Sequence, residues 1–166
     1  ECSPGCSLSD FVTPMAYSFG SPAGMFAISV RSIHTEEHGG GCPGCSSGNE
    51  YDSILERSVR LTLAEAASGW LDAELRKQLP KDSPVKVIRP AAGYASCPDH
   101  TLKRDILDLL PGREALGIKL TETCAMIPEA SICGMIFAHP SAFYPEIRRI
   151  GKSTIENYSS RRGMTE

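Results

Sequence analysis

The chain has little excess charge of either sign and no long hydrophobic run. Its 17 Lys and Arg residues against 20 Asp and Glu residues leave a net charge of −3, so electrostatics gives no reason to expect a nucleic acid or an anionic membrane as a partner. No segment approaches the roughly 18 consecutive apolar residues that a membrane-spanning helix needs. We therefore expect a protein that binds neither nucleic acid nor membrane.

The N-terminus and the cysteine content bear on location. The first residues contain neither a basic leader nor an apolar core, so no signal peptide is expected there. The chain begins with Glu1 rather than Met, which indicates a fragment or a processed chain. Seven cysteines cannot all pair within one chain, and Cys124 and Cys133 stand in apolar, strand-like stretches that predict buried thiols. A reducing, cytoplasmic location is the expectation.

Length and composition favour one globular domain. A chain of 166 residues buries about two thirds of its unfolded surface when it folds as one domain. We expect a single domain over residues 1–166, with irregular or mobile segments at residues 1–24 and 34–50, which are rich in Ser, Pro and Gly. No internal repeat is visible.

Hydrophobic periodicity predicts a mixture of helices and strands. Strands are predicted at residues 25–33 and 85–88, and residues 118–126 and 131–138 are expected to pair as an antiparallel hairpin around residues 127–130. Helices are predicted at residues 51–79 and 101–110. A last helix starts near Ser153, which has capping-box spacing to Glu156, and Gly163 stands at its C-cap position. Without strict βαβ alternation, the fold class is α+β, a largely antiparallel sheet with packed helices.

The two longer helices have apolar positions at helical spacing. In the first helix these positions form one stripe, which we expect to be covered by the rest of the domain: Leu55, Val59, Leu63, Ala66 and Trp70. In the second helix the inward positions are predicted to be Leu102, Ile106, Leu109 and Leu110. The first helix would then be the spine of the domain.

Residues 89–100 are the most informative segment. Pro90 and Pro98 fix φ and remove backbone donors, and Gly93 can adopt a conformation that other residues avoid, so the segment is a shaped loop. The Arg89 guanidinium can bind a carboxylate through two parallel hydrogen bonds, and Tyr94 offers a flat face to a ring or a cation. The loop suits a small zwitterion, although Pro- and Gly-rich loops with one Arg and one Tyr are common without any ligand.

A family resemblance strengthens the ligand interpretation. Arg89, Ala91, Gly93 and Tyr94, followed by residues 97–100 (Cys-Pro-Asp-His), resemble the signature of the activation domain of cobalamin-dependent methionine synthase, which binds S-adenosylmethionine. The likeness continues upstream at residues 8–12, 25–27, 51–52 and 63–66, and downstream at residues 117–123, 125–126, 128, 130–131, 134, 137–140, 156–158 and 161–164. It spans most of the chain and implies the fold of that activation domain.

The resemblance implies roles for particular residues. It places Arg89 on the ligand carboxylate, a task for which Lys is a poor substitute. The backbone at Ala91 and Gly93, with Tyr94 beside it, would line the adenosine side. Glu65 matches a ligand-contacting position of the family, and its alternative interpretation is a solvated helix glutamate.

Tyr144, five residues after His139, is the last position that the resemblance carries over. Residues 141–143 depart from the family pattern, and a core aromatic is the alternative interpretation of Tyr144. An aspartate that the family supplies from an N-terminal extension has no identifiable counterpart in this chain.

The implied function is repair of an inactivated cofactor. The family belongs to a methyltransferase, in which S-adenosylmethionine and one electron restore methylcobalamin after the cobalamin has been oxidised. The implied partners are a cobalamin-binding domain or subunit of methionine synthase and a flavodoxin-like or flavoprotein reductase. The domain would position the methyl donor rather than act as a catalyst alone.

Two other groups of residues invite a chemical interpretation. Asp99, His100 and His139 suggest acid–base chemistry, but no recognised nucleophile motif accompanies them, and Asp99 is equally placed to cap the helix at residue 101. Cys42-Pro-Gly-Cys45 has the spacing of a zinc or thiol-redox motif, with Cys2, Cys6, His34 or His38 as further ligands. The alternative function is therefore a metal-binding or thiol-redox adaptor built on Cys42 and Cys45.

Overall fold

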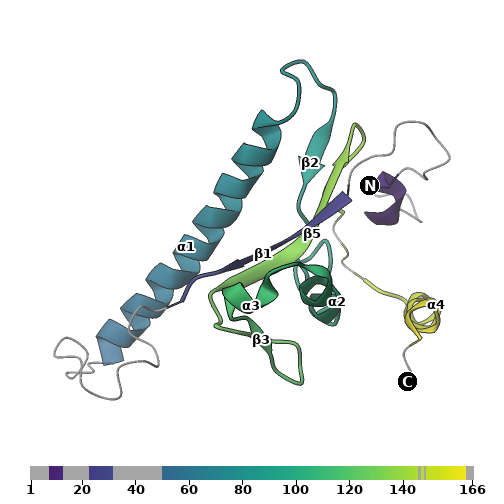
Figure 1. Ribbon diagram of the computed structural model, residues 1–166. Helices are drawn as coiled ribbons and strands as arrows, with labels where there is room; N and C mark the ends of the chain where they lie inside the picture. Colours follow the sequence, from purple (N-terminus) through teal and green to yellow (C-terminus); the bar gives the residue numbers. More distant parts are fainter. Residues whose placement is uncertain (1–7, 13–22, 32–49, 146, 148, 164–166) are drawn as a thin grey trace.

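The computed structural model describes residues 8–12, 23–31, 50–145, 147 and 149–163. In chain order its elements are the 3-10 helix η1 (Leu8–Phe11), then β1 (Ala23–Ser29), α1 (Glu50–Lys77), β2 (Lys86–Ile88), α2 (Leu102–Leu109), α3 (Arg113–Leu116), β3 (Lys119–Leu120), β4 (Met126–Ile127), β5 (Ser131–His139) and α4 (Lys152–Arg162). Figure 1 shows the long helix α1 running beside the sheet, and α4 standing apart near the C-terminus.

β5 is the centre of an antiparallel three-stranded sheet in the order β1-β5-β2. The register places Phe26 opposite Gly134 and Ile88 opposite Phe137. This arrangement confirms the predicted α+β class. β1 begins two residues before the expected start and ends at Ser29, ahead of residues 32–49, which lie outside the described part of the chain.

The predicted hairpin between residues 118–126 and 131–138 is wrong. β3 and β4 pair with each other as a separate ribbon, with Lys119 opposite Ile127. β5 cannot take β3 as a neighbour because β1 and β2 already occupy its two edges. A cis peptide bond between Ile127 and Pro128 lies at the junction between this ribbon and β5.

Helices cover both faces of the sheet. On one face, Phe26 and Ile132 pack against Ala64 of α1. On the other face, Cys133 packs with Ile106 and Leu107 of α2 and with Ala92. Because successive strand residues point to opposite faces, the neighbours Ile132 and Cys133 belong to these two different clusters.

The expected contact face of α1 is wrong. Its buried residues are Ala64 and Ser68, whereas the predicted stripe is exposed: Leu55 by 50%, Val59 by 48%, Leu63 by 51% and Trp70 by 65%, and Ala66 is exposed as well. Small side chains let α1 approach the sheet closely, so the sheet-facing side of the helix is the less hydrophobic one. The predicted stripe is therefore not the side of α1 that the sheet covers.

The second helix fits its prediction only in part. Ile106 is buried, and Leu102 and Leu110 pack against the same cluster, but Leu109 is 66% exposed. Lys103 is buried instead, at 6% exposure. Its ammonium lies 2.9 Å from His100 Nδ1 and donates to the Cys124 carbonyl at 3.2 Å, so the buried cation is hydrogen-bonded.

The two predicted buried thiols are confirmed, and Cys97 joins them. Cys97, Cys124 and Cys133 are free and buried. Cys133 lies in β5, whereas Cys124 lies in the turn between β3 and β4 with a φ of 60°. Burial raises the pKa of both the Cys97 and the Cys133 thiol to about 11, so both are held as thiols at neutral pH.

The last helix begins and ends as the sequence indicated, but its cap differs. The N-cap of α4 is Gly151 and makes no side-chain capping hydrogen bond, so the expected box between Ser153 and Glu156 is wrong. Gly163 has a φ of 64° and ends the helix as predicted. None of the helices in the described ranges is long and apolar enough to cross a membrane.

Gly134 permits the closest backbone approach in the sheet, and its replacement by Ala is predicted to destabilise the fold. An added Cβ would lie 2.4 Å from the Pro90 carbonyl oxygen and 2.8 Å from Ala91 Cα. Backbone atoms cannot move aside cheaply, so Gly134→Ala should lower the free energy of unfolding by about 1–3 kcal/mol in urea denaturation. The control is Gly69→Ala on α1, where nothing lies within 4 Å and a small gain is expected. Equal stabilities of the two variants would contradict this account.

Candidate binding site

The site is organised by the loop that follows β2 and crosses β5. Ala91 forms an isolated bridge with Gly134, and the Ala92 N–H donates to the Cys133 carbonyl at 3.0 Å. The chain then turns back, as the Gly93 N–H donates to the Cys97 carbonyl at 2.7 Å. These backbone hydrogen bonds fix the loop on the central strand.

Gly93 is required by its conformation and by its neighbour. Its φ is 97°, a region that residues with a Cβ rarely adopt. A Cβ there would also lie 2.6 Å from His100 Cε1. The glycine therefore closes the loop against the start of α2, and the loop carries Arg89 on one side and Tyr94 on the other.

Arg89 is held by α1 and by an aromatic ring. Its Nε donates to Asp72 Oδ1 at 3.3 Å, and its Nη1 donates to Ser68 Oγ at 2.5 Å. The guanidinium carbon lies 5.8 Å from the centroid of the Phe26 ring, a cation–π distance. Two of the five N–H donors take part in these hydrogen bonds, and the side chain as a whole is 12% exposed.

Asp72 is shared between two arginines. Its Oδ2 accepts from Arg76 Nε at 2.7 Å, and Arg76 also donates to the Val87 carbonyl at 3.2 Å. Burial disfavours the charged carboxylate, but hydrogen bonds from Arg76 and Arg89 outweigh this and lower the pKa of Asp72. Asp72 therefore remains ionised and fixes the orientation of the Arg89 guanidinium.

Glu65 of α1 is hydrogen-bonded to Tyr94 of the loop after β2. The Tyr94 hydroxyl donates to Glu65 Oε1 at 2.9 Å, while the Tyr94 side chain remains half exposed. Burial, together with the hydrogen bond to Glu65, raises the pKa of Tyr94, so the hydroxyl keeps its proton. Both side chains are exposed, and a carboxylate that uses one oxygen still has a second acceptor oxygen.

Tyr144, in the segment after β5, contacts the backbone of Arg89. Its hydroxyl accepts a hydrogen bond of 2.8 Å from the Arg89 N–H. The side chain is 50% exposed, so the core-aromatic interpretation of Tyr144 is wrong. A tyrosine hydroxyl that accepts here still has its own proton to donate.

The structure thus brings the six candidate positions, Glu65, Arg89, Ala91, Gly93, Tyr94 and Tyr144, into one region built from α1, the loop after β2 and the segment after β5. Sequence reasoning missed Ser68 and Asp72, which hold Arg89. The spacing could have found them: Glu65, Ser68 and Asp72 follow an i, i+3, i+7 pattern and share one side of a helix.

The polar residues after the loop have structural partners. Asp99 Oδ1 accepts from the Thr101 N–H and hydroxyl, both at 2.7 Å, and Oδ2 accepts from the Tyr158 hydroxyl at 2.5 Å. Burial opposes the charge, but the hydrogen bonds from Tyr158 and Thr101 lower the pKa of Asp99. These bonds hold the turn ahead of α2, whose N-cap is Thr101 without a side-chain capping hydrogen bond, so the capping interpretation of Asp99 is wrong. A carboxylate with a lowered pKa is also a poor general acid near neutral pH.

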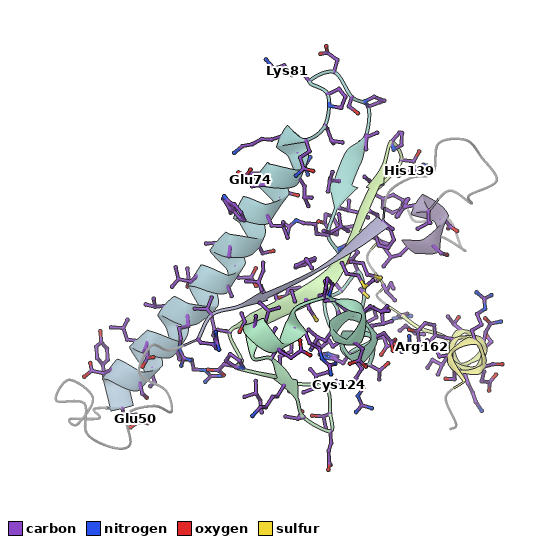
Figure 2. All side chains as sticks on the ribbon, in the orientation of Figure 1. Glu50, Glu74, Lys81, Cys124, His139 and Arg162 are labelled. Carbon is purple, nitrogen blue, oxygen red and sulfur yellow. The ribbon has the colours of Figure 1, made fainter. Side chains whose placement is uncertain are left out.

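The two histidines of the sequence interpretation have polar partners close to them in the sequence. His100 Nδ1 faces the Lys103 ammonium. His139 Nδ1 accepts the Ser141 N–H at 3.1 Å, and its ring lies 6.1 Å from that of Phe11. Figure 2 shows His139 at the far end of β5 from Cys124.

The Cys42–Cys45 motif and its suggested further ligands Cys2, Cys6, His34 and His38 lie outside the described residues. Within the described ranges, no group of three or more His, Cys, Asp or Glu residues is placed to hold a metal ion. An apolar cleft of about 440 Å³ lies elsewhere: it runs between Trp70 and Leu71 of α1, β1 and the turn from α2 to α3. The cleft offers apolar contact, whereas the charged groups gather around Arg89.

Fold and site together define an α+β domain with an arginine, a carboxylate and an aromatic face around a glycine-closed loop. Residues 1–163 match the family model described as vitamin B12 dependent methionine synthase, activation domain, and the chain belongs to this family. A crystal structure of the MetH reactivation domain bound to AdoHcy is 35% identical over 70% of this chain and 40% of that one, with a TM-score of 0.62. This chain therefore spans less than half of that relative. The family resemblance seen in the sequence is confirmed.

The lowered pKa of Asp72 generates a pH prediction. A carboxyl group whose pKa is lower in the folded chain than in the unfolded chain stabilises the fold. This stabilisation is fully present above the ordinary pKa of 3.8, and it is lost as the pH falls through the pKa of the folded chain. Asp72→Asn should therefore be about 1–2 kcal/mol less stable than the wild type at neutral pH, and the difference should shrink below about pH 4. Urea titrations at several pH values measure it.

The matched control for this experiment is Asp82→Asn, an exposed position in the turn after α1. Its difference from the wild type should be small at every pH. A difference for Asp72→Asn that stays constant down to low pH would show that the paired carboxylate is not the cause.

Proposed function

We propose that this chain is an S-adenosylmethionine-binding reactivation module that presents the methyl donor to cobalamin held by a partner domain or subunit of methionine synthase. The observation that carries the proposal is the Arg89 guanidinium fixed by Asp72 and Ser68 beside the Tyr94–Glu65 pair. Family membership and the AdoHcy-bound relative support the choice of ligand.

The charged groups fit the amino-acid end of this ligand. Asp72 and Ser68 bind Arg89 through Nε and Nη1, so a ligand carboxylate would bind at the remaining end of the guanidinium. Glu65 would accept from the ligand ammonium through the oxygen that Tyr94 does not use. Opposite charges at two fixed points distinguish a zwitterion from a simple anion.

The loop suits the nucleoside end. Tyr94 exposes half of its surface as a flat platform, and rings stack on such faces. Ala91 and Gly93 offer backbone close to the ligand, and Tyr144 keeps a hydroxyl proton for the ribose or the carboxylate. These assignments follow the family pattern position by position.

The chain's own residues bind and orient; they do not need to transfer protons. When bound, S-adenosylmethionine would supply the methyl group, and the partner's cobalamin, with one electron from a flavodoxin-like or flavoprotein reductase, would accept it. The partly exposed Tyr94 and Tyr144 leave the site open to such a partner. The chain would thus act as a domain or subunit of a methyltransferase and not as a catalyst alone.

Replacement of Arg89 is predicted to abolish tight binding of S-adenosylmethionine. Arg89→Lys keeps the charge but loses the two-pronged geometry, so affinity should fall by about tenfold to a hundredfold, and Arg89→Ala should lose more. Isothermal titration calorimetry with the purified chain measures both. Circular dichroism confirms that the variants remain folded.

The matched control is Arg57→Ala, which removes an exposed arginine of α1 paired with Glu129 at 2.7 Å. Its affinity for S-adenosylmethionine should equal that of the wild type. Unchanged binding by Arg89→Ala would contradict the proposed site, and weakened binding by both variants would indicate a nonspecific charge effect.

A second pair of variants distinguishes the contribution of the Tyr94 ring to ligand binding from that of its hydroxyl. Tyr94→Phe removes the hydrogen bond to Glu65 but keeps the platform, so the affinity for S-adenosylmethionine should fall less than about fivefold. Tyr94→Ala removes the ring and should cost at least about tenfold. The same calorimetric titration tests both. Equal losses for the two variants would assign the role to the hydroxyl alone.

A further inference from the structure

Arg76, in the last turn of α1, connects this helix to the strand that leads into the ligand loop. Its Nη2 donates to the Val87 carbonyl at 3.2 Å, and its Nε donates to Asp72 Oδ2 at 2.7 Å. In the described part of the chain, β2 is an edge strand, and the open side of such a strand needs other partners for its backbone groups. Figure 1 shows β2 beside the C-terminal end of α1. Arg76 therefore ties this end of α1 to β2, two residues before Arg89.

The Asp72 carboxylate lies between two guanidinium groups and gives one oxygen to each. Its Oδ2 is 2.7 Å from Arg76 Nε, whereas its Oδ1 is 3.3 Å from Arg89 Nε. The terminal torsion of an aspartate is soft, so the shorter of the two bonds has the larger influence on the orientation of the carboxylate. Arg76 consequently determines which oxygen of Asp72 faces Arg89.

Arg89 has few accessible donors to offer a ligand. Only 12% of its side chain is exposed, and Ser68 Oγ accepts from its Nη1 at 2.5 Å. An arginine and a carboxylate prefer a two-bond fork, in which both carboxylate oxygens accept from the same guanidinium. Without Arg76 on Oδ2, Asp72 would be free to form that fork with Arg89. It would then compete with a ligand carboxylate for the same donors.

We propose that Arg76 is a positioning residue that keeps Arg89 available to the ligand carboxylate by holding the second oxygen of Asp72. It acts through Asp72 and does not itself bind the ligand. This inference rests on the proposed function, because it takes the Arg89 guanidinium as the group that binds the carboxylate of S-adenosylmethionine. It adds Arg76 to the residues that set the affinity for the amino-acid end of the ligand.

Isothermal titration calorimetry with S-adenosylhomocysteine, which carries the same amino-acid end, tests the proposal. Arg76→Ala should bind this ligand roughly fivefold to tenfold more weakly than the wild type, because the freed Asp72 carboxylate competes for Arg89. Arg76→Lys keeps a cation beside Asp72 and should lose less. The Arg76 side chain is half exposed, and exposed ion pairs contribute little to the free energy of unfolding. Circular dichroism should therefore find both variants folded.

The double variant Arg76→Ala/Asp72→Asn distinguishes positioning of Arg89 from mere support of the fold. An asparagine side chain has no charge and binds a guanidinium more weakly than a carboxylate does. The double variant should therefore recover part of the affinity that Arg76→Ala loses. If Arg76 only supported the fold, a second substitution in the same network would lower the affinity further.

The matched control is Lys77→Ala, which removes the neighbouring cation of the same helical turn, paired with Glu74 at 2.6 Å. Its affinity for S-adenosylhomocysteine should equal that of the wild type. Binding that is lost in Arg89→Ala but unchanged in Arg76→Ala would overturn the inference and leave the proposed function in place, and so would a double variant weaker than Arg76→Ala. A wild type that does not bind the ligand would overturn both.

Discussion

The crossing of the loop after β2 over β5 is the constraint on which the site depends. Gly134 lacks a side chain, so the Pro90 carbonyl and Ala91 rest directly on the central strand. This contact sets where the chain leaves β2 and therefore where Arg89 points. It also places Gly93, whose positive φ turns the chain back toward Cys97 and presents Tyr94 beside α1. A rigid backbone anchor thus orients side chains that a free loop would leave mobile.

α1 completes the site because this one long helix contacts both the sheet and the loop after β2. Its small buried residues, Ala64 and Ser68, bring the helix close to the sheet. That closeness lets Ser68 and Asp72 reach Arg89 at the end of β2, and it lets Glu65 reach Tyr94. The carboxylate of Asp72 offsets part of the charge of the two nearby guanidinium groups, so Arg89 is held in one orientation while only 12% of its side chain is exposed.

Sequence reasoning predicted the shaped loop at residues 89–100, the class of fold and the positions of the main helices. These features depend on local chemistry: Pro, Gly and periodic apolar residues act within a few positions of themselves. It failed where the structure depends on contacts between residues that lie far apart in the sequence. The stripe of Leu55, Val59 and Trp70 has the pattern of a buried face, but the sheet takes the small-residue side instead. The pairing of β5 with β1 and β2 depends on strands about a hundred and about fifty residues away, which no local pattern encodes. Helical spacing places Asp72 on the same side of α1 as Glu65 and Ser68, but it does not name Arg89, 17 residues away, as the partner of Asp72.

Two regions of the described chain provide the most direct test of the account. One surrounds Arg89 and carries the charged groups, and the other is the apolar cleft between α1, β1 and the turn from α2 to α3. A crystal structure of the chain with S-adenosylhomocysteine would separate them. The account predicts the ligand carboxylate on the Arg89 guanidinium and its nucleoside beside Tyr94. A ligand seated in the apolar cleft, with Arg89 still bound only to Asp72 and Ser68, would contradict it.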